Sequence, residues 1–205
     1  MTDFLAIAVA YLLGSFPTGF VLTRVVTGQD LRTLGSGATG ATNARRALGS
    51  KWGVVVALID VLKGLAAVLI ARWVSGEDLT VALAGIAVIV GHCWPIWLGF
   101  RGGKGIATGA GVALGFSWWG LLLVPILIVP VALTRYVSVG SLIAAASAPL
   151  IFGLLAMTGD GPIEYLVTAL IAGIVIIGRH RENIERLRAG TERRLTGRPG
   201  TSGNA

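Results

Sequence analysis

The stretch that decides the fold is "IATGAGVALGFSWWGLLLVPILIVPVALT", residues 106–134, which carries no charged side chain. A helix that crosses a bilayer needs about 20 apolar residues, so this stretch is long for one helix and short for two. Charge decides between the two. A single helix would place Arg135 and the arginine-rich C-terminal segment on different sides of the membrane, whereas two short helices that turn near "SWWG" (117–120) place them on the same side.

The rest of the chain is equally apolar. Apolar residues make up 54% of the 205 and charged residues 13%, which excludes an ordinary soluble domain of this size. Further spans are expected at residues 4–26 (broken by "GSFPTG" at 14–19), 53–71, 79–100, 139–157 and 163–178. The sequence therefore predicts an all-α polytopic membrane protein of about seven transmembrane helices. We expect a single domain over residues 1–195 and a disordered Gly/Pro/Ser-rich tail over 196–205.

The charges also predict an orientation. With seven helices, every Lys and Arg except Lys63 and Arg72 falls in segments on one side. The other side holds acidic residues: Asp3, Glu77, Asp78, Asp160 and Glu164. The positive-inside rule then places the N-terminus outside and the C-terminus in the cytosol. The net charge is +7, and the basic residues flank apolar segments and do not cover the face of a soluble domain. The expected partner is therefore the lipid bilayer and not nucleic acid.

The first polar loop is "LGSGATGATNARRALG", residues 34–49. It contains a G-x-G-x-x-G pattern, but no strand precedes it and no βαβ unit can follow, which argues against dinucleotide binding. Its small residues would let backbone N–H groups converge, and further donors follow on the side chains of Ser36, Thr39, Thr42 and Asn43. Arg45 and Arg46 lie on an expected short helix that ends at Gly49. Two interpretations stay open: an anion-binding loop, or a flexible loop whose arginines only set the topology.

The second polar loop is "RGGKG", residues 101–105. It is not a Walker loop, because Leu98 stands where that motif requires its first glycine. Consecutive glycines still allow backbone N–H groups to form an anion nest, and a helix that begins near Gly105 would add its N-terminus. Lys104 would supply a full charge. An anion site is favoured over a basic loop at the membrane edge, since the latter does not explain the glycines.

The third polar segment is "GRHRENIERLRAGTERRL", residues 178–195, interpreted as a helix that continues the last span. Helical spacing places His180 and Asn183 on one face with Ile184 and Leu187, and we expect this face to turn toward the protein. Glu182 lies on another face and can pair with Arg186. Ser141, at the cytoplasmic end of its span, could join His180 and Asn183.

Two titratable pairs lie within apolar segments. Asp60 and Lys63 are one turn apart, so we expect them to pair, as a structural pin in preference to a transport path. His92 and Cys93 have no companion at ligand spacing, so no metal site is expected, and a single cysteine excludes an internal disulfide.

Four segments of the chain together resemble a known family. "GSFPTGFVLTR", "GSGATGATNARRALG", "GHCWPIWLGFRGGKGIATGAG" and "HRENIERLRAGTERRL" are similar, in order and spacing, to the signature segments of PlsY, the bacterial acyl-phosphate-dependent glycerol-3-phosphate acyltransferases. One departure is Ala38, where family members commonly carry Asn. The resemblance implies a multi-pass enzyme of the bacterial inner membrane with its active site at the cytosolic face.

The implied reaction moves a fatty acyl group from acyl phosphate to the sn-1 hydroxyl of glycerol 3-phosphate, giving lysophosphatidic acid and phosphate as the first acylation of phospholipid synthesis. No cofactor or metal is implied, and the enzyme that makes acyl phosphate is implied as a partner. The implied catalytic residues are Ser36, Arg46, Lys104, His180 and Asn183, with Glu182 in a structural role. The predicted substrate-binding residues are Gly37, Thr42, Asn43, Gly102, Gly103, Thr108 and Ser141. His180 and a phosphate oxygen of the substrate both remain candidates for the proton acceptor.

Two other functions compete with this one. A transporter of phosphate or organic phosphates would use Asp60 and Lys63 on its path and would need polar groups accessible from both faces. A non-catalytic binder of anionic lipids would explain the arginines but not His180 and Asn183.

Overall fold

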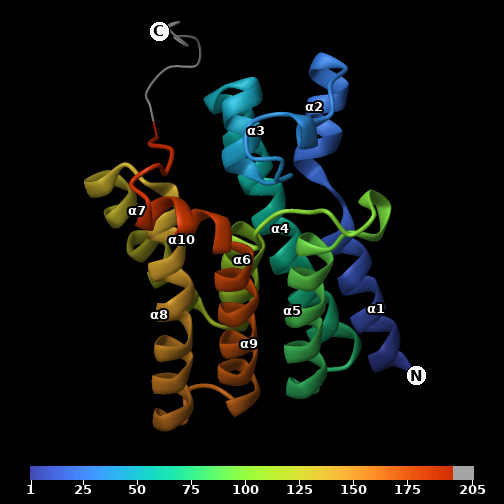
Figure 1. The fold of residues 1–205 in the computed structure, drawn as a ribbon. Helices are drawn as coiled ribbons and strands as arrows, with labels where there is room; N and C mark the ends of the chain where they lie inside the picture. The colour runs from blue at the N-terminus through green and yellow to red at the C-terminus, as the bar shows by residue number, and fades with distance from the viewer. Residues whose placement is uncertain (196–205) are drawn as a thin grey trace, which may run out of the picture.

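The computed structural model describes residues 1–195, and the predicted tail at 196–205 lies outside the described residues. Within the described part the regular structure is entirely helical. The long helices stand side by side in one bundle (Figure 1). They are α1 (Thr2–Ser15), α4 (Ser50–Val74), α5 (Asp78–Cys93), α6 (Ile106–Phe116), α7 (Leu123–Thr134), α8 (Val137–Thr158) and α9 (Ile163–Arg179). The all-α fold class is therefore confirmed.

Shorter elements gather mainly at the end of the bundle that carries the last described residues (Figure 1). Three are α-helices: α2 (Thr18–Thr27), α3 (Ala41–Leu48) and α10 (Arg181–Arg188). The 3₁₀ turns are η1 (Leu31–Thr33), η2 (Ile96–Leu98) and η3 (Trp118–Leu122). Helix α3 has its last residue at Leu48 and Gly49 as its C-cap, at the end that the sequence predicted.

Residues 106–134 form two helices, as predicted. Helix α6 ends at Phe116, η3 makes the turn over "WWGLL", and α7 returns. At 11 and 12 residues these helices rise only about 16–18 Å each. By length and composition, four helical segments of the described chain can cross a bilayer: Thr2–Thr27, Ser50–Val74, Asp78–Leu98 and Val137–Thr158. The bent pair of α9 and α10 makes a fifth if it counts as one span. The count of seven transmembrane helices therefore stays a prediction.

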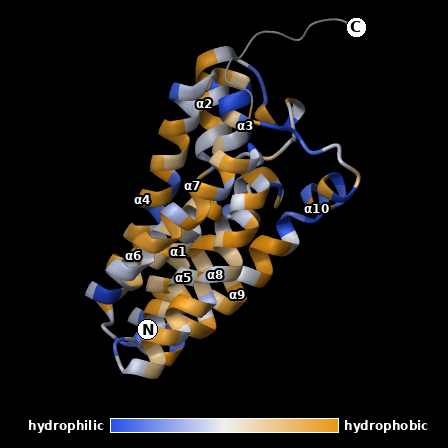
Figure 2. Ribbon diagram, turned by 90° about the vertical axis from the view of Figure 1, so that its left-hand side faces the viewer, coloured by the Kyte–Doolittle hydropathy of each residue, from blue (hydrophilic) through white to orange (hydrophobic). Residues whose placement is uncertain are grey.

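The bundle is apolar along most of its length and polar at its α2–α3–α10 end (Figure 2). The N-terminus lies at the opposite end from this polar end (Figure 1). This arrangement is the one expected of an odd number of passes, and the orientation in the membrane remains a prediction.

A buried ion pair joins three helices near the break between α1 and α2. Lys63 Nζ lies 2.8 Å from Asp60 Oδ1 and donates to the Phe16 carbonyl at 3.1 Å. Thr18 Oγ1 donates to the same Asp60 oxygen at 3.1 Å. His92 Nδ1 of α5 lies 3.7 Å from it. Because Asp60 is 1% exposed, its charge depends on these partners, and the predicted pairing of Asp60 with Lys63 is confirmed.

The predicted continuous helix over 178–195 is wrong. Helix α9 ends at Arg179, and α10 leaves it at an angle of 57°. Helix α10 itself ends at Arg188, after which Gly190 adopts a left-handed backbone with φ +68°. Residues 191–195 then run without helix to the start of α8, where the Leu195 amide donates to the Arg135 carbonyl at 2.6 Å. We call residues 191–195 the C-terminal strap.

Candidate active site

A cavity of about 340 Å³ opens at the polar end of the bundle, a size typical of ligand sites. Its wall brings together many of the predicted site residues: Ser36, Thr42, Asn43, Arg46, Lys104, Ser141, His180 and Asn183. It also contains polar residues that the sequence did not assign to a substrate site: Asp60, His92, Ser138, Arg186, Glu192 and Arg193. Three polar segments that are distant in the sequence therefore meet at one site.

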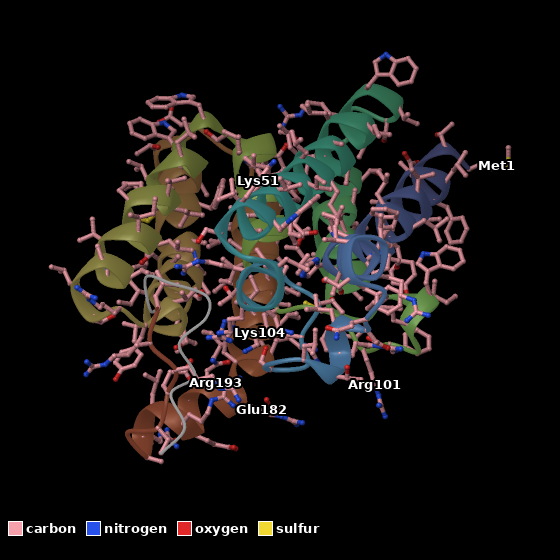
Figure 3. The ribbon with its side chains drawn as sticks, turned by 90° about the horizontal axis from the view of Figure 1, so that it is seen from above. Met1, Lys51, Arg101, Lys104, Glu182 and Arg193 are labelled. Carbon is pink, nitrogen blue, oxygen red and sulfur yellow. The ribbon has the colours of Figure 1, made fainter. Side chains whose placement is uncertain are left out.

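Four cations line this cavity: Arg46, Lys104, Arg186 and Arg193. Figure 3, which views the polar end, shows Lys104 and Arg193 on different segments, and both line the cavity. The carboxylates in the wall are Glu192 and Asp60, and Asp60 is already paired with Lys63. The cavity thus has an excess of positive charge, which suits a phosphate-bearing ligand.

Arg46 projects from α3 and differs from Lys104 and Arg186, whose side chains are bonded to neighbours. It forms no hydrogen bond or ion pair with another residue of the described chain, although it lies in the cavity wall. Burial, followed by the nearby Arg193 charge, lowers the pKa of the Arg46 guanidinium. Since an arginine keeps its charge in proteins, Arg46 remains available to an incoming anion.

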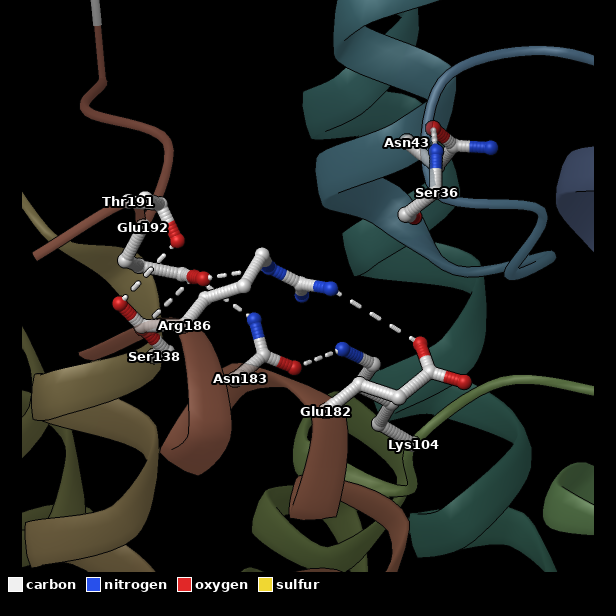
Figure 4. A network of polar contacts seen from close by, with 9 residues as sticks. All are labelled: Ser36, Asn43, Lys104, Ser138, Glu182, Asn183, Arg186, Thr191 and Glu192. Carbon is white, nitrogen blue, oxygen red and sulfur yellow. Dashed lines mark hydrogen bonds and ion pairs between the residues drawn. The ribbon is translucent and has the colours of Figure 1, made fainter. Parts of the chain in front are cut away.

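Lys104 reaches toward α10, where its Nζ donates to Asn183 Oδ1 (Figure 4). Partial burial, and then the charge of Arg186, lower the pKa of Lys104 to about 8. Lys104 is therefore mostly protonated at pH 7 but loses its charge within a pH range in which enzymes are commonly assayed.

Asn183 is held from its other side by Glu192 on the C-terminal strap. Asn183 Nδ2 donates to Glu192 Oε1 at 2.6 Å, and Ser138 Oγ donates to the same oxygen at 2.9 Å. Arg186 Nε donates to Glu192 Oε2 at 2.8 Å (Figure 4). These contacts fix which side of the Asn183 amide faces Lys104. Burial acts to raise the pKa of Glu192, but the donors Asn183, Arg186 and Ser138 outweigh it, and the pKa is lowered.

The sequence reasoning missed Glu192, because it placed residue 192 on a continuous helix. A signal was present in "RAGTE", since a glycine directly after the last helical turn is a common helix stop. That stop frees the strap to fold back against α8.

His180 lies in the bend between α9 and α10 and is 4% exposed. Its Nδ1 lies 2.8 Å from the Ile176 carbonyl. A carbonyl only accepts, so Nδ1 must carry the proton, which leaves the Nε2 lone pair for a ligand in the cavity. Burial chiefly lowers the pKa of His180 to about 4, with further lowering by Lys104, so the imidazole is neutral at pH 7.

Asn43 lines the cavity and also shapes the first polar loop, and its predicted contact with substrate stays a prediction. Its Nδ2 donates to the carbonyls of Leu31, Leu34 and Ala38 at 2.9–3.2 Å. Its Oδ1 accepts from the Ser36 amide at 3.0 Å. Gly35 adopts φ +57°, and a Cβ there would overlap Asn43 Oδ1. The amide group is thus engaged within the loop, and its role is to place Ser36 at the cavity wall.

Gly102 and Gly103 do not form the expected nest of free N–H donors. Their amides donate to the carbonyls of Cys93 and His92, at 3.2 and 3.0 Å. A Cβ on Gly102 would overlap the His92 carbonyl, and one on Gly103 would overlap the His92 imidazole. The glycines are therefore required for close packing on the end of α5, and neither lines the cavity.

Arg179 holds the same loop from its outer side. Its Nε donates to the Gly103 carbonyl at 3.1 Å, and its NH2 group donates to the Gly102 carbonyl at 3.4 Å. Its guanidinium lies 5.5 Å from the centre of the Trp94 ring. The loop is thus fixed through both its amides and its carbonyls, which directs Lys104 into the cavity.

Two other predicted binding residues lie outside the cavity wall. Thr108 is fully buried and faces α4, where a Cβ on Gly64 would overlap its carbonyl. Its position on α6 turns it away from Ile106 and Ala110, which do line the cavity. Gly37 adopts φ +71°, and its amide closes a turn onto the Leu34 carbonyl at 3.0 Å.

Glu182 is exposed and absent from the cavity wall, in keeping with its predicted position on another face from Asn183. Its Oε2 lies 3.8 Å from Arg186 NH1, and the carboxylate side chain is 61% exposed. Exposed pairs of this kind stabilise proteins by about 0–1 kcal/mol, so the predicted structural role of Glu182 is small. Glu192 is the carboxylate that organises the site.

No group of three or more His, Cys, Asp or Glu side chains within residues 1–195 is placed to hold a metal ion. The site instead provides positively charged side chains, the neutral imidazole of His180 and the fixed side-chain amide of Asn183. Such a site can bind anions and orient a hydroxyl group.

The chain is similar to known proteins over nearly its whole length. The family model described as glycerol-3-phosphate acyltransferase matches residues 4–190. A glycerol-3-phosphate acyltransferase of Geobacter sulfurreducens is 48% identical over 95% of this chain and 98% of its own. One of Synechococcus sp. (strain CC9902) is 43% identical over 95% and 96%.

The solved structures include a close match in fold. The glycerol 3-phosphate form of PlsY (YgiH), an integral membrane glycerol 3-phosphate acyltransferase, aligns with a TM-score of 0.88 at 40% identity and covers 96% of both chains. Its lysophosphatidic acid form aligns with a TM-score of 0.83 at 38% identity, covering 95% of both. Since sequence and fold agree over nearly the whole length, the chain is an integral membrane protein and belongs to the glycerol-3-phosphate acyltransferase family.

Proposed function

We propose that this protein transfers a fatty acyl group from acyl phosphate to the sn-1 hydroxyl of glycerol 3-phosphate, at the cytosolic face of the bacterial inner membrane. The observation that carries the proposal is the convergence of Arg46, Lys104, Arg186 and Arg193 on one cavity that also holds the neutral His180. Two phosphate groups, one on each substrate, would account for this amount of charge.

The shape of the cavity supports a ligand with an apolar chain. Its polar wall lies beside Arg46 and Lys104, and further in it is lined by apolar side chains of α4, α6 and α7, among them Val61, Ala110 and Ile128. A donor with a charged phosphate head and a fatty tail would place its head at the polar wall and its tail along the apolar wall. Glycerol 3-phosphate is small and fully polar, so it would occupy the charged part.

The donor is already activated, so the protein does not have to form a covalent intermediate. In acyl phosphate the carbonyl carbon already carries phosphate as its leaving group. The acceptor hydroxyl oxygen attacks that carbon, the bond from carbon to the phosphate oxygen breaks, and the hydroxyl proton leaves. The protein has mainly to hold the hydroxyl near the carbonyl and to balance the developing negative charge, which Lys104 and Arg46 can do.

The proton has two candidate acceptors. His180 Nε2 can accept a hydrogen bond, but a pKa of about 4 makes this imidazole a weak base. A phosphate group, whose second pKa is about 6, is the stronger base of the two. In this proposal His180 therefore orients the hydroxyl, and the phosphate of the donor takes the proton.

A transporter is less well supported. The outer end of the bundle has its own pocket, lined by Arg72, Asp78 and Asp160 among others. The space between this pocket and the charged cavity is lined almost entirely by apolar side chains of α6, α8 and α9. Asp60 and Lys63 are paired with one another and with the chain around the break after α1, as a structural pin would be.

The test is to reconstitute purified protein in lipid nanodiscs with acyl phosphate and glycerol 3-phosphate. We expect lysophosphatidic acid acylated at the sn-1 position, identified by mass spectrometry and NMR. In parallel, proteoliposomes are assayed for uptake of glycerol 3-phosphate. Uptake without acyl transfer would favour the transporter.

A further inference from the structure

A second cavity, which is apolar, lies beside the charged one, between α6, α8 and α9. Its free volume is about 60 Å³, several times the 10–15 Å³ that one water molecule needs on the same measure. The wall is made largely of small side chains, including Gly109, Ala113, Ala145, Ala148 and Ala172. An apolar cavity of this kind stays free of water and can take up an apolar ligand, which restores dispersion contacts to its lining.

The two cavities adjoin. Ile106, Ala110, Leu123 and Leu127 line both of them. A fatty chain whose head lies at Lys104 can therefore pass along α6 into the apolar cavity. Ten residues separate Ile106 from Phe116 on α6, which corresponds to about 15 Å along the helix axis.

Phe116 closes the far end of this route. It lines the apolar cavity on one side and the outer pocket on the other, and so does Phe152. The Phe116 ring stacks on Tyr165, with centroids 4.1 Å apart, and meets Phe152 edge-on at 5.8 Å. These three rings form the floor between the two spaces, and we call them the aromatic floor.

The floor is rigidly held. The Phe116 carbonyl accepts from Arg72 at 3.4 Å, and Tyr165 Oη accepts from Arg72 and donates to Asp78, both at 3.0 Å. On α5, a Cβ on Gly85 would lie 2.8 Å from the Phe116 ring, so a glycine leaves the space for it. A floor fixed in this way sets a sharp limit to the depth of the cavity.

We propose that the apolar cavity holds the last few carbons of the donor's acyl chain, and that Phe116 determines the longest chain the enzyme uses efficiently. This proposal rests on the proposed function, because it takes a fatty acyl donor as given. One extra methylene in a hydrophobic pocket changes kcat/KM by about 10–200-fold, so the limit should be measurable.

The test compares acyl phosphates of 12 to 20 carbons in competition, with the lysophosphatidic acids quantified by mass spectrometry. Phe116→Ala, and Phe116→Leu as a milder variant, should raise the use of chains longer than the parent's optimum by about tenfold or more relative to the optimum. Ala148→Leu, which fills the cavity above the floor, should shift the optimum to shorter chains. Leu150→Ala, at an exposed residue of α8 that lines neither cavity, should leave the chain-length profile unchanged.

Binding of alkyl phosphates of the same lengths, measured in nanodiscs by calorimetry, separates the two proposals. A parent that makes no lysophosphatidic acid would contradict the proposed function, while the dependence of affinity on chain length would still test the floor. An unshifted profile in Phe116→Leu and Ala148→Leu, in turnover or in binding, would overturn the role of Phe116.

Discussion

The side-chain amide of Asn183 donates to Glu192 Oε1 at 2.6 Å, and this contact joins α10 to the strap that follows it. Because Nδ2 is held by Glu192, Oδ1 is left to accept from Lys104. In the proposed reaction we therefore expect Glu192 to position its neighbours, and Asn183 and Lys104 to face the substrate.

The first prediction separates those roles. Asn183→Ala should lower kcat by about 10²-fold or more, because it removes a contact that tightens in the transition state, with little loss of yield. Glu192→Ala should lower the free energy of unfolding by about 1–3 kcal/mol, since it leaves the buried donors Ser138 and Asn183 and the partly exposed Arg186 without their acceptor. The measurements are kcat with acyl phosphate and the melting temperature in detergent.

Glu182→Ala is the matched control for Glu192→Ala. Its carboxylate is exposed and 3.8 Å from Arg186, so the change in stability should stay within about 1 kcal/mol. A Glu182 variant that is folded but inactive would show that this carboxylate takes part in the chemistry, contrary to our assignment.

The second prediction concerns Lys104 and pH. With a pKa of about 8, this lysine is charged below pH 8 and neutral above it, so kcat/KM should fall as the pH rises through 8. Lys104→Arg should retain activity at pH 9, because arginine keeps its charge. Lys104→Ala should lose about 1.5–3 kcal/mol of substrate binding or transition-state stabilisation at pH 7, about one to two decades in kcat/KM.

The acid side of the same profile tests the proton acceptor. If a substrate phosphate takes the proton, kcat/KM should fall below about pH 6. A profile that stays flat down to about pH 4 would instead match the pKa of His180 and make it the base.

The third prediction concerns Gly103. Gly103→Ala places a methyl group in the His92 imidazole, so the loop must move and Lys104 moves with it. We expect a loss of about 1–3 kcal/mol in stability together with a lower kcat. Gly178→Ala, where a Cβ meets no atom within 4 Å, should be neutral or slightly stabilising. Equal behaviour of the two variants would show that the contact with His92 is unimportant.

The fourth prediction concerns orientation. With the polar end in the cytosol, Ser50→Cys should react with a membrane-impermeant thiol reagent only after the cells are permeabilised. Glu77→Cys, at the other end of the bundle, should react in intact cells. The native Cys93 is buried and should not interfere. The reverse labelling pattern would invert the topology and move the site outside.

The sequence predicted the helices well where hydropathy and charge agreed. The split of residues 106–134 follows from the charges around it, and the pairing of Asp60 with Lys63 and the shared face of His180 and Asn183 follow from spacing. The structure confirms all three. These features depend on charge placement and local spacing, which one sequence contains.

The sequence was less informative wherever a contact depended on how distant segments fold back. Glu192 enters the site only because the chain turns at Gly190 and the strap packs on Ser138. The amides of Gly102 and Gly103 looked free for an anion, but α5 supplies their acceptors. Asn43 likewise looked like a ligand donor, and loop carbonyls occupy it.

The identity of the donor is the central claim, and the release of phosphate tests it most directly. Purified protein is given glycerol 3-phosphate with acyl phosphate, acyl-CoA or acyl carrier protein bearing the same chain, and both lysophosphatidic acid and inorganic phosphate are measured. We expect acyl phosphate to give the two products in equal amounts, at a kcat/KM at least about tenfold above either thioester, because in the proposed site Lys104 and Arg46 bind the phosphate of the donor. Equal or faster transfer from a thioester, or lysophosphatidic acid formed from acyl phosphate without matching phosphate release, would contradict the account.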